Sequence, residues 1–411
     1  MEPLISVDDH VVEPPHVWTG RLPRRLRSDA PRVERRRLAR SLTTVGARQV
    51  ARSSAHGAIL GEAAGDSGAG EGGSGDGSPC DWWIFEDQAV PLTRHAATIG
   101  FERMQMNYDG VTFDEIHDGC YTPTGRLRDM DLDGVEVSVM FASVAGVAGQ
   151  ALLAMRDKAL AAACVAAYND WFYEEWTEPS GGRMLPVALV PLWDVEASAA
   201  EVRRNAARGI PTVGFPDIPA SLGLPSLHGG QWDPFFAACE ETGTTVSMHI
   251  GSSGRPPKTS DDMPMAVMAN VSCLNSILGL SDWLFSGVLV RFPRLKFFLG
   301  EAQVGWIPYF LERADTVWER QKGWTDIDPA ITEPPSTYLG DRFFASWVSD
   351  RTGVLAYPTI GRYTTFGTDY PHTNTWWPDT HRTLVRYLEG IPEPVVRMIL
   401  RENGLRLIGR V

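Results

Sequence analysis

The sequence has no excess of positive charge and no long apolar run. Its 411 residues carry a formal net charge of −13 at pH 7. Binding to nucleic acid or to an anionic membrane surface needs a basic face, so neither is expected. No apolar stretch approaches the roughly 20 residues that a helix needs to cross a bilayer. These absences leave a small-molecule substrate or ligand as the expected partner.

Cysteines are few and dispersed. The chain has 5 of them, and no two form a CxxC pair. An odd, scattered set suits a reducing compartment better than a disulfide framework. The N-terminus carries acidic residues where a signal peptide would have a basic stretch and then an apolar one. We therefore expect a cytoplasmic protein.

One segment near the N-terminus differs in composition from the rest of the chain. Arginines crowd the stretch RLPRRLRSDAPRVERRRLAR, and DSGAGEGGSGDGS further on is almost entirely glycine, serine and acidic residues. Such a composition buries too little apolar surface to offset the entropy lost on ordering. We predict a disordered, Arg- and Gly-rich insertion over residues 33–79. It serves either as a solvated loop or as a basic tether for an acidic partner.

The remaining sequence alternates between short apolar segments and helical ones. Turn residues bound each apolar segment, and the segments are rich in β-branched or aromatic residues, as in buried strands. They lie at residues 4–7, 135–141, 184–192, 212–215, 244–250, 295–300, 343–348 and 364–368. Helical patterns between them include residues 200–209, 233–243 and 305–321. Eight strands alternating with helices predict an α/β fold, a (β/α)₈ TIM barrel over residues 1–411 interrupted by the insertion. An open doubly wound sheet is the alternative, but the chain has no GxGxxG turn.

Polar side chains that can bind a metal follow four of these strands. Asp8, Asp9 and His10 follow the first, and Asp8 and His10 share one face of an extended strand because they are two residues apart. His249 ends the fifth strand. In a barrel the carboxyl ends of the strands meet at one rim, where catalytic groups lie.

The other two strand ends complete the pattern. Glu301 follows the sixth strand, and Asp369 follows the eighth. Imidazole and carboxylate ligands suit Zn²⁺, with Mn²⁺, Fe²⁺ or Co²⁺ as alternatives. Each residue also has a structural interpretation: Asp369 could begin a turn before Tyr370-Pro371, and Glu301 could cap the next helix. The joint pattern favours a metal site.

Several segments together resemble the amidohydrolase-related family, the branch of the amidohydrolase superfamily that includes aminocarboxymuconate-semialdehyde decarboxylase and resorcylate-type decarboxylases. They are VDDHVVEPPHVW, RLRDMDLDGVEVSVMF, ACVAAYNDW, WDPFFAACEETGTTVSMHIG, RFPRLKFFLGEAQVGWIPYFLERAD and FGTDYPH. The resemblance spans most of the chain except roughly residues 32–79. It implies a metal-dependent barrel whose ligands are Asp8, His10, His249 and Asp369. Many members have a catalytic histidine after a glycine on strand six, where this chain has Gly300-Glu301.

Two chemical hypotheses follow, and a third is non-catalytic. In the first, a metal-activated water cleaves an amide-like C–N bond of a small or peptide-derived molecule, and Asp369 accepts the water's proton. In the second, the chain is a metal-dependent non-oxidative decarboxylase of an aromatic or unsaturated acid, and Glu301 or His372 supplies the proton. In the third, the barrel binds without turnover.

Two more residues are candidates for substrate binding, and one segment is a candidate interface. Arg255, in GSSGRPP, could grip a carboxylate with its guanidinium, and Trp306 could stack on a flat ring. A surface arginine and a loop-packing tryptophan are the alternatives. The apolar stretch at residues 266–289 could pack against a second copy, so we expect a homodimer.

Overall fold

Eight parallel strands form the centre of the structure. The computed structural model describes residues 2–37, 79–260 and 262–411. The strands are β1 (Leu4–Val11), β5 (Val135–Ala142), β6 (Met184–Ala188), β7 (Thr212–Gly214), β8 (Thr245–His249), β9 (Phe297–Gly300), β10 (Phe343–Trp347) and β11 (Thr364–Phe366). They lie side by side in that order, and each neighbouring pair is parallel. The predicted α/β barrel with eight strands is confirmed.

Backbone hydrogen bonds bring the first strand and the segment after the last one together. The amide of Asp369 donates to the carbonyl of Asp8 at 2.9 Å, and the amide of His10 donates to the carbonyl of Tyr370 at 2.7 Å. Both bonds lie at the carboxyl ends of the strands. They close the ring at the rim where the strand-end polar residues gather.

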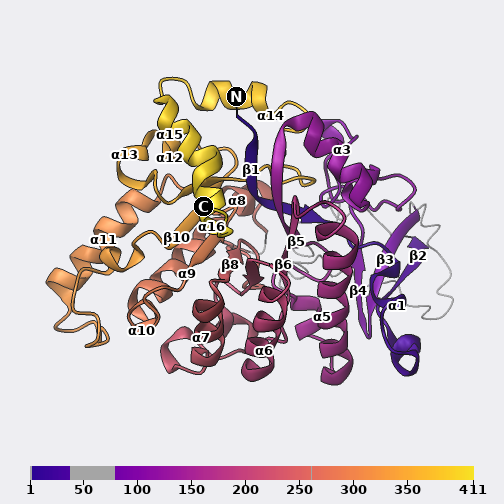
Figure 1. Ribbon diagram of the computed structural model, residues 1–411, viewed down its shortest axis with the longest axis horizontal. Helices are drawn as coiled ribbons and strands as arrows, with labels where there is room; N and C mark the ends of the chain where they lie inside the picture. Colours follow the sequence, from indigo (N-terminus) through magenta and orange to yellow (C-terminus); the bar gives the residue numbers. More distant parts are fainter. Residues whose placement is uncertain (1, 38–78, 261) are drawn as a thin grey trace.

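Helices surround the barrel, as Figure 1 shows for α5, α6, α7 and α11. The helices are α1 (His16–Thr19), α3 (Pro123–Asp133), α4 (Gln150–Leu153), α5 (Lys158–Phe172), α6 (Val195–Ala206), α7 (Asp233–Thr242), α8 (Met265–Asn270), α9 (Leu274–Phe285), α10 (Val288–Arg291), α11 (Ile307–Gln321), α12 (Arg351–Leu355), α13 (Tyr357–Ile360), α14 (Thr380–Tyr387), α15 (Glu393–Arg397) and α16 (Asn403–Leu407). The expected helix at residues 200–209 begins earlier, because the Asp194 carboxylate accepts the amide of Ala197 and caps α6.

Apolar side chains form one core inside the barrel and another between the strands and the helices. Ile5 and Val7 of β1 belong to the inner core, together with Phe141, Phe298 and Phe344 from other strands. The larger outer core includes residues of α5, α7, α9 and α11. The inner core fills the barrel beneath the rim, so polar side chains can gather only at its end.

A β-bulge in β1 decides which side chains face the barrel interior. Ser6 pairs with Ser138, whereas Asp9 pairs with Met140, so β1 carries an extra residue at this point. With Val7 inside, strict alternation would send Asp9 inward and Asp8 outward. The extra residue reverses this. Asp9 instead accepts hydrogen bonds from the hydroxyls of Ser6 and Ser138, and Asp8 turns towards the rim.

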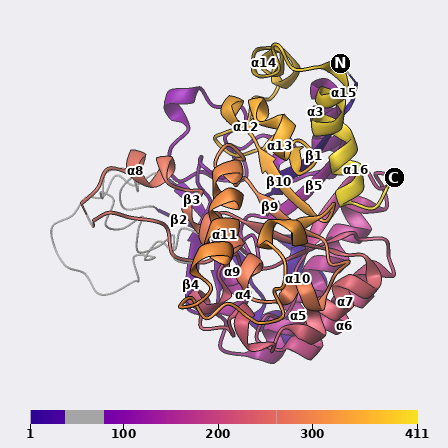
Figure 2. The ribbon, with the colours of Figure 1, turned by 90° about the vertical axis from the view of Figure 1, so that its left-hand side faces the viewer.

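A small antiparallel sheet flanks the barrel, and it corrects one prediction. Its strands are β2 (Arg32–Arg37), β3 (Pro79–Phe85) and β4 (Gln88–Pro91), and Figure 2 shows α8 beside it. The prediction that disorder begins at residue 33 is wrong, because residues 33–37 pair with β3. Arg35 forms ion pairs with Asp81 and Asp114, and these two carboxylates offset positive charge in the arginine-rich strand. The prediction is also wrong at its other end, because Pro79 belongs to β3 and pairs with Arg37. The rest of the predicted insertion, residues 38–78, lies outside the described residues.

Two further observations concern the whole described chain. All five cysteines are free. Within residues 2–37, 79–260 and 262–411, no helix is both long enough and apolar enough to cross a bilayer. Leu274 and Leu278 of α9 are exposed apolar side chains, and a homodimer through this segment stays a prediction.

Candidate metal centre

Four side chains from distant parts of the chain meet at the rim of the barrel. Asp8 and His10 come from β1, His249 ends β8, and Asp369 follows β11. The Nε2 atom of His249 lies 3.3 Å from Oδ1 of Asp8, and Nε2 of His10 lies 3.3 Å from Oδ1 of Asp369. Nε2 of His10 is also 4.0 Å from Oδ1 of Asp8. All four residues are buried.

The atoms that meet are the ones without a hydrogen-bond partner. Oδ1 of Asp8, Nε2 of His10, Nε2 of His249 and Oδ1 of Asp369 are all buried, and none has a partner among the described residues. Leaving a buried polar atom unpaired costs about 1–3 kcal/mol, so four such atoms in one place call for a ligand. Two imidazole nitrogens and two carboxylate oxygens are a donor set that fits a divalent transition-metal ion.

For Asp8 and His249, the protein holds the atom that points away from the centre. Oδ2 of Asp8 accepts the hydroxyl of Ser346 at 2.6 Å and the backbone amide of Glu301. Nδ1 of His249 lies 2.7 Å from the carbonyl of Ile250, to which it donates in the matching tautomer. Fixing one atom of each of these two ligands aims the other atom at the centre, as outer partners do in metal sites.

The His10 imidazole has less direct support. Its backbone carbonyl accepts a hydrogen bond from the buried guanidinium of Arg126, and neither ring nitrogen has a partner among the described residues. The Phe141 ring lies 5.8 Å from the His10 ring and 4.9 Å from the His249 ring, measured between centroids. An apolar ring under the cluster lowers the local dielectric and strengthens electrostatic interactions there.

His372 joins the cluster through the turn that follows Asp369. The amide of His372 donates to the carbonyl of Asp369 at 2.7 Å, and Asp369 itself has a left-handed φ of 53°. The turn stacks the His372 ring on the His10 ring, with centroids 3.8 Å apart. Nδ1 of His372 then lies 3.3 Å from Oδ1 of Asp369. His372 is therefore within reach of the same ion or of a molecule bound beside it.

Glu301 follows β9 in a left-handed conformation, with φ of 50°. Its backbone amide holds Asp8, as described above, and its carboxylate lies 3.8 Å from Nε2 of His249. The side-chain amide of Asn374 donates to the other carboxylate oxygen. Glu301 thus lines the cluster with a carboxylate at the position where many relatives were expected to have a histidine.

The crowded charges shift the pKa values of the cluster. Burial raises the pKa of Glu301 well above its usual range, and the Asp369 carboxylate adds to this. Burial opposes ionisation of Asp369 as well, but the imidazoles of His372 and His10 overcome it and lower the pKa of Asp369. Burial lowers the pKa of His10 to about 3. For His249 the Asp8 carboxylate outweighs burial and raises the pKa to about 9. The cluster therefore mixes protonated and ionised groups at neutral pH.

The two predicted substrate-binding residues, Arg255 and Trp306, differ in their surroundings. Arg255 is exposed in the segment after β8. The Trp306 indole donates to the carbonyl of Ala302 at 2.9 Å and packs edge-on against Phe310. These contacts fit the loop-packing alternative for Trp306. A role for either residue in substrate binding stays a prediction.

Sequence reasoning missed two residues near the cluster, His95 and Tyr108. Their rings stack with centroids 4.5 Å apart, and the His95 ring lies 6.1 Å from the His372 ring. Burial, aided by the Glu301 carboxylate, raises the pKa of Tyr108 to about 12. Neither residue follows a barrel strand, so a search of strand ends could not find them. A histidine and a tyrosine in a long polar segment were the only signal.

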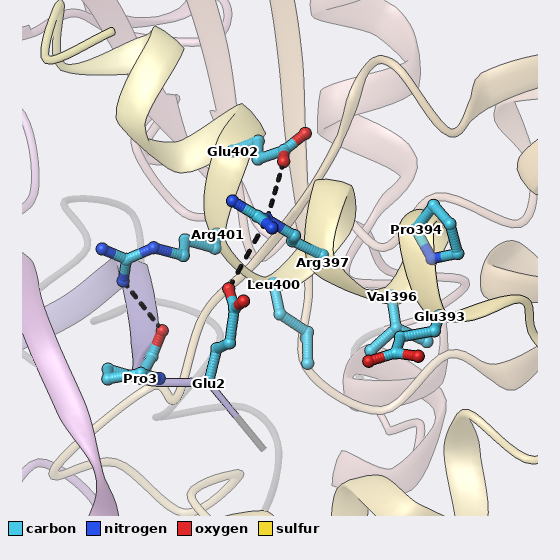
Figure 3. Close-up of a pocket in the computed structure, with 9 residues that line it drawn as sticks. All are labelled: Glu2, Pro3, Glu393, Pro394, Val396, Arg397, Leu400, Arg401 and Glu402. Atoms are coloured by element: carbon cyan, nitrogen blue, oxygen red, sulfur yellow. Dashed lines mark hydrogen bonds and ion pairs between the residues drawn. The ribbon is translucent and has the colours of Figure 1, made fainter.

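A cavity of about 400 Å³ lies elsewhere, at the amino end of β1 (Figure 3). Glu2, Pro3, Arg397 and Leu400 are among its lining residues, and Arg397 forms ion pairs with Glu2 and Glu402. In a barrel the amino ends of the strands contribute stability and the carboxyl ends contribute chemistry. The rim cluster, with its unpaired buried atoms, is therefore the candidate functional site.

Comparison with known families agrees with this geometry. The amidohydrolase family profile matches residues 115–410. The chain belongs to the amidohydrolase family. The matched segment begins eight residues before α3, ends at residue 410, and includes His249, Glu301 and Asp369. Asp8 and His10 precede it, and the barrel brings them to the same rim.

Named relatives of the family include decarboxylases. The chain is 24% identical over 290 residues to 2-amino-3-carboxymuconate-6-semialdehyde decarboxylase of Dictyostelium discoideum, covering 69% of this chain and 74% of that protein. A crystal structure of an amidohydrolase from Mycobacterium avium subsp. paratuberculosis K-10 has a TM-score of 0.70 at 19% identity and covers 99% of both chains. A dihydroxybenzoic acid decarboxylase from Polaromonas sp. JS666, with bound manganese and the inhibitor 2-nitroresorcinol, has a TM-score of 0.54 at 20% identity and covers 69% of this chain and 85% of that one.

Proposed function

We propose that this amidohydrolase-family protein is a metal-dependent decarboxylase of a planar aromatic or unsaturated carboxylic acid. The observation that carries the proposal is the meeting of four unpaired, buried imidazole and carboxylate atoms at one rim of the barrel. The decarboxylases among its relatives, one of them with manganese bound, support the reaction class. This interpretation replaces amide hydrolysis, the first hypothesis from the sequence, as the leading one.

Asp8, His10, His249 and Asp369 would hold the divalent ion. When bound, the ion supplies a Lewis acid that draws in the substrate carboxylate and a neighbouring oxygen and spreads the negative charge that develops as CO₂ leaves. The chain's own part is to fix these donors. Ser346 and the Glu301 amide hold Asp8, and the Ile250 carbonyl holds the ring of His249.

The reaction breaks the bond between the carboxylate and the substrate carbon, and its electron pair stays on that carbon. CO₂ departs, and a proton takes its place, so no oxidant or reductant is needed. Glu301 is suited to deliver this proton, because its carboxyl lies beside His249 and is held by the Asn374 amide. His372, stacked on His10 and beside Asp369, is the second candidate.

The test is the release of labelled CO₂ from carboxyl-labelled 2,6-dihydroxybenzoate and from unsaturated acids of similar size. We expect release by the manganese- or zinc-loaded protein, loss of release with EDTA, and recovery when the metal is added back. Glu301→Gln should lower the rate of carbon protonation at least 100-fold, in line with general acid catalysis. Glu312→Gln, an exposed position on α11, is the matched control. Release that survives EDTA unchanged would contradict the proposal.

Hydrolysis of an amide-like bond is a second candidate, and the Gly300-Glu301 pair favours it. A carboxylate there lacks the imidazole that the resemblance associates with decarboxylation. The structural relative that covers 99% of this chain is named only as an amidohydrolase. In this reaction Asp369 would accept the proton of the attacking water and return it to the leaving nitrogen. Amine release from a panel of N-acyl compounds, run beside the CO₂ assay, separates the two reactions.

A further inference from the structure

An 18-residue segment between β4 and α3, residues 93–110, forms a loop whose two ends are joined. Thr93 and Gly110 form an antiparallel bridge. Beside it, the amide of Arg94 donates to the carbonyl of Asp109 at 3.0 Å, and the amide of Val111 donates to the carbonyl of Leu92 at 2.9 Å. Loops closed at the base in this way are frequently functional.

The same loop is fastened to the turn that carries the metal-site residues. The amide of Thr98 donates to the carbonyl of Pro371 at 2.9 Å. The hydroxyl of Thr98 lies within hydrogen-bond distance of that carbonyl, at 2.8 Å, and of the carbonyl of His372, at 3.0 Å. Thr98 is buried. These contacts fix loop 93–110 against the segment from Asp369 to His372.

His95 and Tyr108 lie on the two arms of the loop and stack almost parallel, with an interplanar angle of 9°. The His95 ring is next to the His372 ring, which in turn stacks on His10. Tyr108 also packs on the core cluster of Cys80, Trp82 and Ile84, so the small sheet supports the stacked rings of His95 and Tyr108. The stacked rings of His95 and Tyr108 therefore form a supported aromatic surface next to the candidate metal centre, which we call the wall.

The polar atoms of this wall have no protein partner. Neither the ring nitrogens of His95 nor the hydroxyl of Tyr108 forms a hydrogen bond with the described part of the chain. Both residues are half-buried, and these polar atoms are not among the fully buried unpaired ones, so they are open to solvent and free to bind a ligand. Two unpaired polar groups on a supported aromatic wall suit a ligand that is itself flat and polar.

We propose that His95 and Tyr108 determine substrate specificity by donating hydrogen bonds to a hydroxyl or carbonyl oxygen on the side of a planar acid away from the metal ligands. The inference rests on the proposed function for the nature of the acid. The substrate carboxylate lies with the metal ligands, and its distal ring substituent lies against the wall. An acid without that substituent leaves these groups unsatisfied and binds more weakly.

The test compares two acids that differ only in one hydroxyl on the side of the ring away from the carboxylate, 2,4-dihydroxybenzoate and 2-hydroxybenzoate. Their Kd values are measured by calorimetry on the manganese-loaded full chain. Tyr108→Phe and His95→Phe keep the stacked rings and remove the polar atoms. Each should weaken 2,4-dihydroxybenzoate binding about tenfold, the loss expected for one hydrogen bond, and leave 2-hydroxybenzoate binding unchanged. Tyr309→Phe, on an exposed position of α11, should change neither value.

Each outcome decides either this inference or the proposed function. Equal weakening of both acids, no weakening of either, or a wild-type protein that binds neither acid overturns the role of the wall. Hydroxyl-specific weakening without any CO₂ release supports the wall and removes decarboxylation. CO₂ release from an unsaturated acid by a protein that binds neither of the two test acids supports decarboxylation and contradicts the role of the wall.

Discussion

Oδ1 of Asp8 and Nε2 of His249 lie 3.3 Å apart, although the two residues are 241 positions apart in the chain. β1 and β8 stand four places apart in the ring of eight strands, so the two side chains reach the barrel axis from opposite sides. Each has its second polar atom already engaged, and the atoms that face each other are unpaired. A cation between them satisfies both.

Removing either member of this pair should weaken metal binding strongly. Asp8→Asn replaces a carboxylate oxygen donor, and His249→Ala removes an imidazole donor. We expect metal affinity to fall roughly 100-fold or more, since even outer-shell losses cost 10–100-fold. Elemental analysis after dialysis against Mn²⁺ measures this. His228→Ala, an exposed histidine paired with Asp282, should keep the ion. A retained ion in the Asp8 and His249 variants would remove the metal centre from this rim.

Ser346→Ala should weaken metal binding without removing a ligand. The hydroxyl of Ser346 donates to Oδ2 of Asp8 and fixes the carboxylate. We expect a loss of about 10–100-fold in metal affinity, measured by competition with a fluorescent chelator. The control is Ser281→Ala, whose hydroxyl donates to the carbonyl of Ile277 within α9. Equal affinities in the two variants would mean that Ser346 has no orienting role.

The methyl group added by Gly367→Ala should displace Asp8 through a steric clash. A Cβ atom at Gly367 would lie 2.4 Å from Cβ of Asp8, closer than such atoms approach in proteins, so β1 or β11 must move. We expect loss of metal affinity and a destabilisation of about 1–3 kcal/mol, as for other overpacked sites. Gly323→Ala has open space around the new Cβ and serves as the control. Thermal unfolding and metal titration together report both effects, and unchanged values at Gly367 would contradict the close approach.

The carboxyl of Asp133 should make stability fall as the pH rises. Asp133 ends α3, where a negative charge opposes the helix dipole, and burial raises its pKa from 3.8 to about 6. The folded state therefore holds the proton more tightly. This contribution is fully present below about pH 4 and is lost as the pH rises through 6, at a cost of up to about 3 kcal/mol.

Asp133→Asn removes the ionisable group and keeps an oxygen for the amide of Thr380. Relative to the wild type, the variant should gain stability between pH 4 and pH 7, as measured by urea unfolding at several pH values. Glu196→Gln, at an exposed position on α6, should show no such trend. If the difference in unfolding free energy between the wild type and Asp133→Asn does not change with pH, the pKa of the Asp133 carboxyl is not raised in the folded protein.

The strands and the chemistry at their ends could be predicted from sequence because both are local properties. Apolar, β-branched segments between turn residues mark the strands, and the residue after each strand must lie at the rim of any barrel. That reasoning reached Asp8, His10, His249, Glu301 and Asp369. It failed at residues 33–37, because their partner strand β3 begins more than 40 residues later in the chain.

What the sequence by itself determined was the barrel and the kinds of side chain at its mouth. Only the tertiary structure decided how they face one another. The bulge in β1 turns Asp8 inward against strict alternation, the Glu301 amide holds Asp8, and loop 93–110 brings His95 and Tyr108 to the rim. These outcomes depend on register, ring closure and packing between segments far apart in the chain, and none of those is encoded in the spacing of nearby residues.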